Sequence, residues 1–151
     1  MKIRLHRVND RVHFQAANAD GNTIEVDGAE RVGGEGAGFR PMQLALAALA
    51  SCSVMDLVPI LEKQRQVVDD VDIEATGERV DGTPSPFSAI NLHYILTGGI
   101  DEKKAQRAVE LAVYKYCSVG EMLKATVDIT YSFEVRDRSG QVTGRGGGQS
   151  V

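Results

Sequence analysis

The first 27 residues alternate apolar and polar positions with the period of two that is typical of β-strands. Ile3 and Leu5 alternate with basic residues, and Phe14 and Ala16 alternate with polar ones. Short clusters of Asn, Asp and Gly, which favour turns, separate these runs. The pattern predicts a β-meander followed by a mobile, glycine-rich loop over residues 28–38.

A long helix is predicted from Pro41 to about Gln66, because proline suits the first helical position. From Leu44 to Leu61 the segment is apolar on every side except at Asp56. Its length would suit a membrane span, but a central Asp would be unfavourable in lipid. We therefore expect the buried helix of a soluble protein and no membrane partner.

After the long helix, segments with the strand period of two alternate with segments of helical period, and the last residues show neither pattern. The predicted elements are strands over 71–80 and 87–96, helices over 101–117 and 118–124, and a strand over 125–136. Four of the last eight residues are Gly, and no core-forming pattern is visible there. The prediction is a single domain of residues 1–137 and a disordered tail of residues 138–151.

The element order β-β-β-α-β-β-α-α-β predicts an α+β fold. One further long helix and about six strands are too few to cover a central helix that is apolar on every side. A second copy of the chain would supply the missing cover, so a homodimer is expected.

Charge and composition exclude several classes of function. The chain has 17 Lys and Arg against 21 Asp and Glu, and no basic cluster, which argues against nucleic acid as a partner. The N-terminus has no apolar core of a secretory signal, so a cytoplasmic location and reduced thiols are expected. The three His residues have no metal-ligand spacing to each other or to the cysteines, so no metal and no cofactor are expected.

Two cysteines are the candidate reactive groups. Cys52 lies inside the predicted central helix, and Cys117 lies at the end of the second one. A lone Cys in an apolar helix is more often a packing residue than a nucleophile. Asp56 and Glu121 each follow a cysteine by four residues, which places each one turn along on the same helix face.

A carboxylate alone raises the pKa of a thiol, which disfavours the nucleophilic thiolate. A positive group from elsewhere in the fold is therefore required. The candidates are Arg40, Arg79 and His93, and the sequence does not choose among them.

Two separated motifs resemble the OsmC/Ohr family of osmotically induced and organic hydroperoxide resistance proteins. GFRPMQLALAALASCSVMDLVPIL, residues 38–61, is similar to the family's central helix, which carries the peroxide-attacking Cys. KYCSVGEML, residues 115–123, is similar to the motif with the resolving Cys. The resemblance covers residues 1 to about 136.

The resemblance implies an intertwined homodimer with two central helices packed against sheets from both chains. It also implies that Cys52 attacks a peroxide and passes to sulfenic acid, and that Cys117 resolves it as a disulfide. An external dithiol, such as a dihydrolipoyl group, would reduce that disulfide. Organic hydroperoxides would be the favoured substrates.

The chain departs from the family pattern at two positions. The better-studied members use an Arg from the N-terminal strands and a Glu early in the central helix. Here the strand segment HFQAANADG has no Arg, and Met42, followed by Gln43, stands at the Glu position. The chain is closer to an OsmC-like subgroup with a PM(E/Q)L motif. These departures keep a second hypothesis open, namely a non-catalytic redox sensor or a protein that binds small hydrophobic ligands.

Overall fold

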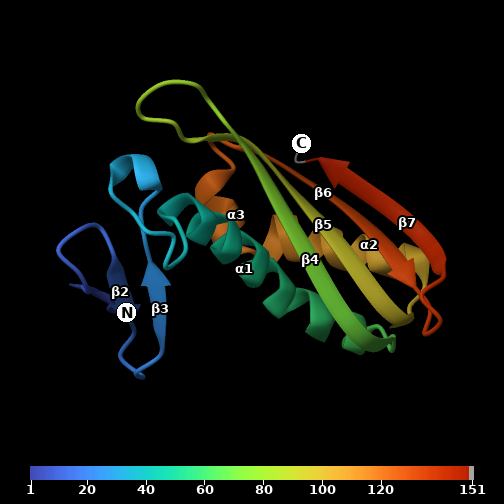
Figure 1. Ribbon diagram of the computed structural model, residues 1–151. Helices are drawn as coiled ribbons and strands as arrows, with labels where there is room; N and C mark the ends of the chain where they lie inside the picture. Colours follow the sequence, from blue (N-terminus) through green and yellow to red (C-terminus); the bar gives the residue numbers. More distant parts are fainter. Residues whose placement is uncertain (150–151) are drawn as a thin grey trace. The chain divides into compact units, whose positions relative to one another are not determined.

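A computed structural model describes residues 1–149 of the chain (Figure 1). The chain divides into two compact units, one of residues 1–45 and one from Leu46 onward. Helix α1 (Pro41–Lys63) begins in the first unit and continues into the second. The sequence predicted one domain of residues 1–137; the N-terminal strands instead pair only within residues 1–45, with one another and with Phe39, and belong to a unit of their own.

The first unit contains the predicted β-meander. Strands β1 (Arg4–Arg7), β2 (Phe14–Ala17) and β3 (Thr23–Val26) form an antiparallel sheet in chain order. Leu5 is paired with Ala16, and Ala16 with Ile24, so the apolar positions of the three strands share one face.

The loop after β3 is held by Asp27, which is 2% exposed. Its carboxylate accepts backbone N–H bonds from Gly28, Glu35 and Ala37 at 2.7–3.0 Å. A turn of 3-10 helix, η1 (Glu30–Val32), lies inside the segment they enclose. The sequence predicted a mobile loop here, because the composition shows many glycines. It does not show that the Asp27 carboxylate binds three backbone N–H groups of the segment.

Replacing Asp27 by Asn is expected to lower the free energy of unfolding at pH 7. The backbone N–H groups, first those of Ala37 and Glu35, hold the pKa of Asp27 below its usual range. A depressed pKa contributes stability above the unfolded-state value of about 3.9, and that contribution is lost as the pH falls through the folded-state pKa. Urea unfolding should therefore show a gap between wild type and variant that shrinks below about pH 4. An equal gap at pH 3 and pH 7 would contradict this role.

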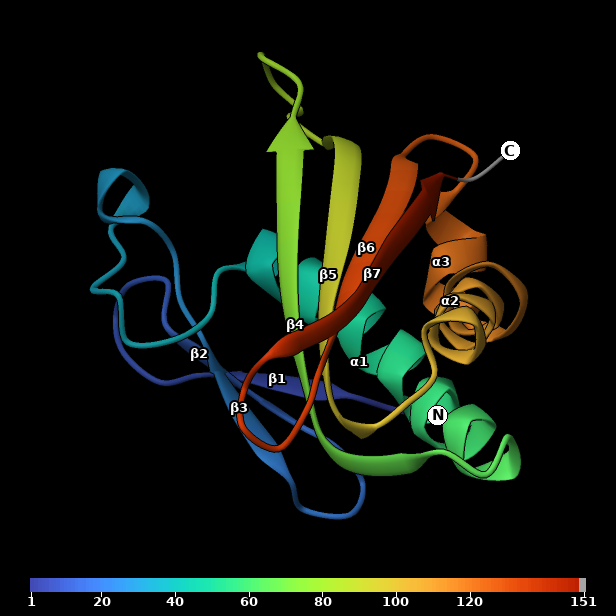
Figure 2. The same ribbon diagram turned by 90° about the vertical axis from the view of Figure 1, so that its right-hand side faces the viewer.

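The second unit is a four-stranded sheet with helices on one face (Figure 2). The strand order is β4-β5-β6-β7, and β5 and β6 are parallel while the other neighbours are antiparallel. A parallel pair needs a long connection, which α2, the π-helical turn η2 and α3 provide. The strands are β4 (Val67–Arg79), β5 (Phe87–Gly99), β6 (Asp128–Arg136) and β7 (Val142–Gln149), and the helical elements are α2 (Glu102–Leu111), η2 (Ala112–Tyr116) and α3 (Ser118–Leu123).

The core of this unit lies between the helices and one face of β5 and β6. Every second residue of these two strands is buried, as the alternating pattern predicted. Helix α2 contributes a stripe of small residues, which lets it lie close to the sheet. The largest buried side chains are Leu49, Leu57, Leu61, Ile90, Leu92, Tyr94, Leu96, Val109, Phe133 and Val135.

The C-terminal segment is a strand and not the disordered tail predicted for residues 138–151; residues 150–151 lie outside the described part. Gly144, Gly146 and Gly148 of β7 recur with the strand period of two. A Cβ at Gly146 would lie 2.3 Å from the Gln106 side-chain oxygen of α2 and 2.4 Å from the Phe133 ring. Glycine is therefore required for α2 and β7 to approach each other, and the sequence prediction treated these glycines only as flexible positions.

Helix α1 buries a single stripe, which consists of Leu49, Ser53, Leu57 and Leu61. By length and composition it could also cross a membrane, a test that core helices of soluble proteins pass as well. Along its apolar stretch from Leu44 to Leu61, these four residues are the ones that are buried. The remaining residues of that stretch are half-buried or exposed, and Met55 is its one exposed large apolar side chain among the described residues.

Candidate active site

The two cysteines lie next to each other in the second unit, although 64 positions separate them in the sequence. Cys52 is half-buried on α1, and Cys117 is 4% exposed at the start of α3. The Cys117 thiol donates to the Leu49 carbonyl of α1 at 3.8 Å, and the Cys52 side chain lies near enough to raise the pKa of Cys117. Leu49 and Cys52 are three residues apart on one helix, so Cys117 packs against a single face of α1. Both thiols are free.

The surroundings of Cys117 favour its protonated form. Burial raises the pKa of Cys117 to about 11, and the neighbouring Cys52 thiol adds to the rise. The Gly120 N–H, which donates to Sγ of Cys117 at 3.2 Å, opposes that rise without cancelling it. At neutral pH Cys117 is therefore a thiol and not a thiolate.

A buried hydrogen bond fixes α1 to the sheet beside Cys52. The Tyr94 hydroxyl of β5 donates to Oγ of Ser53 at 2.6 Å, and Ser53 in turn donates to the Ala50 carbonyl at 2.8 Å. Tyr94 and Ser53 are both fully buried. Because Ser53 adjoins Cys52 in the chain, this bond fixes the rotation of α1 that brings Cys52 to Cys117.

Ser53→Ala is expected to destabilise the protein more than Tyr94→Phe does. Removing the Ser53 hydroxyl leaves the buried Tyr94 donor without its acceptor, at a cost of about 2 kcal/mol. Tyr94→Phe leaves Ser53 bonded to Ala50 and costs about 1 kcal/mol. Urea unfolding of the two variants tests this order, and equal or reversed effects would contradict it.

The two carboxylates singled out by sequence differ in their surroundings. Asp56 is half-buried on α1, one turn after Cys52. Glu121 is exposed, and its carboxylate pairs with the Lys124 ammonium at 2.7 Å. The ion pair directs the Glu121 side chain along its own helix, whereas Asp56 keeps its predicted place on the cysteine-bearing helix.

The three candidate cations lie in different parts of the molecule. His93 is on β5 and bonds Ser132 of β6, and it lies on the face of the sheet opposite Tyr94 because neighbouring strand residues point to opposite sides. Nε of Arg79 donates to the Ser85 carbonyl at 2.7 Å. Arg40 belongs to the first unit and is exposed. His93 therefore faces away from α1, while a role for Arg40 stays a prediction.

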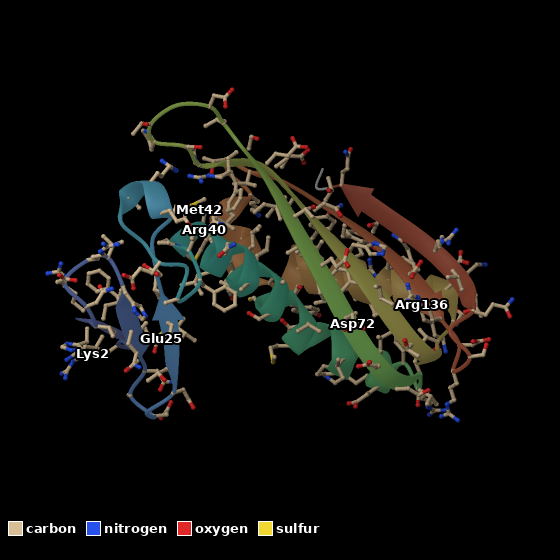
Figure 3. All side chains as sticks on the ribbon, in the orientation of Figure 1. Lys2, Glu25, Arg40, Met42, Asp72 and Arg136 are labelled. Carbon is tan, nitrogen blue, oxygen red and sulfur yellow. The ribbon has the colours of Figure 1, made fainter. Side chains whose placement is uncertain are left out.

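Helix α1 is capped by Gln43, the neighbour of Met42. Oε1 of Gln43 accepts the backbone N–H of Arg40 at 2.9 Å, which satisfies one of the free N–H groups at the helix start. Arg40 and Met42 flank Pro41 at this end of the helix (Figure 3). Gln43 is thus a capping residue, and Met42 stands at the position where the better-studied family members have a Glu.

Sequence reasoning found the cysteines but missed the residues that hold them. Ser53, Tyr94 and Gly120 carry no signature of their own in the sequence. The one available signal was the position of Tyr94 on the apolar side of a cleanly alternating strand, since a buried tyrosine hydroxyl usually finds a partner. Within residues 1–149, no three His, Cys, Asp or Glu side chains are grouped so that they could hold a metal ion.

Comparison with known proteins agrees with the fold and with both motifs. A family model described as OsmC-like protein matches residues 34–132. Protein YhfA of Escherichia coli K12 is 42% identical over 123 residues, which are 81% of this chain and 89% of YhfA.

Two solved structures are also similar. A hypothetical protein from Aquifex aeolicus is 32% identical with a TM-score of 0.79, covering 91% of this chain and 96% of that one. An organic hydroperoxide resistance protein OsmC from Legionella pneumophila is 22% identical with a TM-score of 0.68, covering 87% of this chain and 94% of that one.

The fold and the paired thiols define an α+β protein of the OsmC/Ohr kind, as the two sequence motifs predicted. The chain belongs to the OsmC-like protein family.

Proposed function

We propose that this protein is a thiol-dependent peroxidase that reduces organic hydroperoxides. The observation that carries the proposal is the contact between a half-buried Cys52 and a buried Cys117 that stays protonated. Two thiols in contact can store two electrons as a disulfide, and their unequal surroundings assign them different roles. The names of family members as organic hydroperoxide resistance proteins support this substrate class.

Cys52 is the attacking sulfur in this proposal. It is the thiol that a peroxide can reach, and its partner has a pKa of about 11, too high to supply a nucleophile at neutral pH. The Cys52 thiolate attacks the terminal peroxide oxygen, the O–O bond breaks, and the alkoxide leaves with a proton as an alcohol. Cys52 becomes a sulfenic acid.

Cys117 then resolves the sulfenic acid. Its sulfur attacks Sγ of Cys52, and its proton leaves with the hydroxyl group as water. The bond between the two sulfurs completes a two-electron oxidation, and an external dithiol, such as a dihydrolipoyl group, restores both thiols by exchange. The Gly120 N–H stabilises negative charge on Cys117 as that thiol gives up its proton.

The proposal includes a homodimer in the cytoplasm. The apolar residues of α1 that are half-buried or exposed favour a partner in water, and a second copy would supply one. The first unit carries further exposed apolar side chains, namely Ile3, Leu5, Ile24 and Phe39. A reducing compartment would keep both cysteines in the thiol form that the reaction needs.

Steady-state turnover tests this function. The protein, with dihydrolipoate as the reductant, should consume cumene hydroperoxide at a rate proportional to protein concentration. No consumption with this or any other dithiol would contradict a peroxidase. Oxidation by peroxide without turnover would favour the alternative, a redox sensor. Two departures from the family pattern keep that alternative open: the strand segment has no Arg, and Met42 stands at the Glu position.

A further inference from the structure

A cavity lies within the second unit, between its helical elements α2, η2 and α3 and the strands β6 and β7. Its volume is about 450 Å³, within the range of small-molecule sites. It is lined by α2, η2, α3, the start of β6 and the end of β7, and Cys52 is not among its lining residues. The π-helical turn η2 forms part of its wall, and such turns are frequent at functional sites.

The wall of the cavity contains a buried hydroxyl group with room for another partner. Tyr131 is 3% exposed, and its hydroxyl accepts a bond from Nε2 of Gln106 at 2.6 Å. No second hydrogen bond to this hydroxyl is formed by the described residues. A Cβ at Gly148 would lie 3.0 Å from the same oxygen, so the glycine is what leaves the hydroxyl open to the cavity.

Aromatic rings and a surplus negative charge complete the site. The rings of Tyr114 and Tyr131 lie 5.5 Å apart at an angle of 58° and form an apolar wall. Among the charged lining residues, Glu121 and Lys124 neutralise each other at 2.7 Å. Glu110 is left as the surplus charge of the lining, and its partner, Arg107, lies outside the lining.

The charge of Glu110 acts on both tyrosines. After burial, the Glu110 carboxylate is the further cause that raises the pKa of Tyr131, and it also contributes to raising the pKa of Tyr114. The Glu110 carboxylate therefore lies near both hydroxyl groups, although Arg107 also pairs with it at 3.0 Å. An ammonium group would be attracted by the carboxylate and by the ring faces, and it could donate to the open Tyr131 oxygen.

We infer that this cavity is a second ligand site, for a small organic cation that carries an ammonium group on an apolar or aromatic body. The Glu110 carboxylate binds the ammonium group, and the tyrosine rings contact the apolar body. The space left by Gly148 admits the ligand to Tyr131. Cys52 lies outside the lining, and Gly120 is shared with the Cys117 environment, so binding is tested on the reduced protein without any turnover.

The test is a titration of the ¹⁵N-labelled, full-length, reduced protein with 2-phenylethylamine, followed by amide NMR. Saturable shifts are expected at Gly120, Gly147 and Gly148, and the anion 3-phenylpropionate should not produce them. Glu110→Gln should weaken the binding by about tenfold. Glu62→Gln, which removes an exposed charge at the end of α1, should leave it unchanged.

Gly148→Ala is the second variant, because a methyl group there would lie against the Tyr131 hydroxyl and block it without changing any charge. It should abolish the shifts while the rest of the spectrum and the thermal unfolding midpoint show an intact fold. The inference is overturned if millimolar 2-phenylethylamine gives no saturable shift. It is also overturned if the anion binds equally well, or if both Glu110→Gln and Gly148→Ala bind as wild type does.

Discussion

Replacing Cys52 by Ser is expected to reduce dithiol-dependent hydroperoxide consumption to background, a loss of at least about a thousandfold. A serine hydroxyl is not ionised at neutral pH and is a far weaker nucleophile toward oxygen than a thiolate. Cys117 cannot take over, because its pKa of about 11 keeps it protonated and its side chain is buried. The measurement is the initial rate with cumene hydroperoxide and dihydrolipoate at equal protein concentrations.

Cys117→Ser is the matched variant, because it replaces sulfur by oxygen at the other cysteine. It should keep the first step, so that one equivalent of peroxide leaves a trappable sulfenic acid on Cys52. Its sulfenic acid should persist longer, because no internal thiol condenses with it. A Cys52→Ser protein that retains the wild-type rate, or a sulfenic acid found on Cys117, would reverse the assigned roles.

Replacing Gly146 by Val is expected to lower the free energy of unfolding by about 3 kcal/mol. The first added carbon would lie 2.3 Å from the Gln106 side-chain oxygen and 2.4 Å from the Phe133 ring. Both contacts are far inside van der Waals separation, so either β7 moves away from the sheet or α2 moves away from β7. Urea or thermal unfolding of the variant measures the effect.

Arg145→Val is the control, because it places the same side chain one residue away on the opposite face of β7. Arg145 is largely exposed, and its only charged neighbour among the described residues is Glu134 at 3.8 Å. The control should therefore change the stability by less than about 1 kcal/mol. Similar small effects of both substitutions would mean that the segment is not packed, as the disordered tail predicted from sequence would require.

The sequence predicted elements well where one hydrophobic period ran unbroken. Ile90, Leu92, Tyr94 and Leu96 alternate along β5, and all four are buried. The central helix begins at Pro41 as predicted and ends three residues before the predicted Gln66. In both cases the local pattern and the tertiary packing favour the same structure.

The sequence could not predict structure that depends on long-range contacts. Gly144, Gly146 and Gly148 have no side chains and hence no hydrophobic period. The close approach of α2 explains Gly144 and Gly146, and the Tyr131 ring of β6 lies against Gly148. Composition alone predicted disorder there. The three backbone bonds of Asp27 join residues up to ten positions apart, and a carboxylate in a glycine-rich stretch looks no different from one in solvent.

The candidate site divides in the same way. Both cysteines could be found from their motifs, but their contact is a property of the fold, since β4, β5 and α2 separate them in the chain. The Ser53–Tyr94 bond and the pKa of Cys117 follow from burial, which no local pattern encodes. The sequence did not decide which of Arg40, Arg79 and His93 supplies positive charge to Cys52. The structure disfavours His93, because it faces away from α1.

The most direct test of the paired-thiol account is the intact mass of the protein after one equivalent of cumene hydroperoxide. The reduced protein should lose two hydrogen atoms within seconds, and peptide mapping should find a disulfide between Cys52 and Cys117. Cys52→Ser should show no change under the same conditions. Thiols that stay reduced, or a stable oxygen adduct on Cys52 with Cys117 free, would contradict the account.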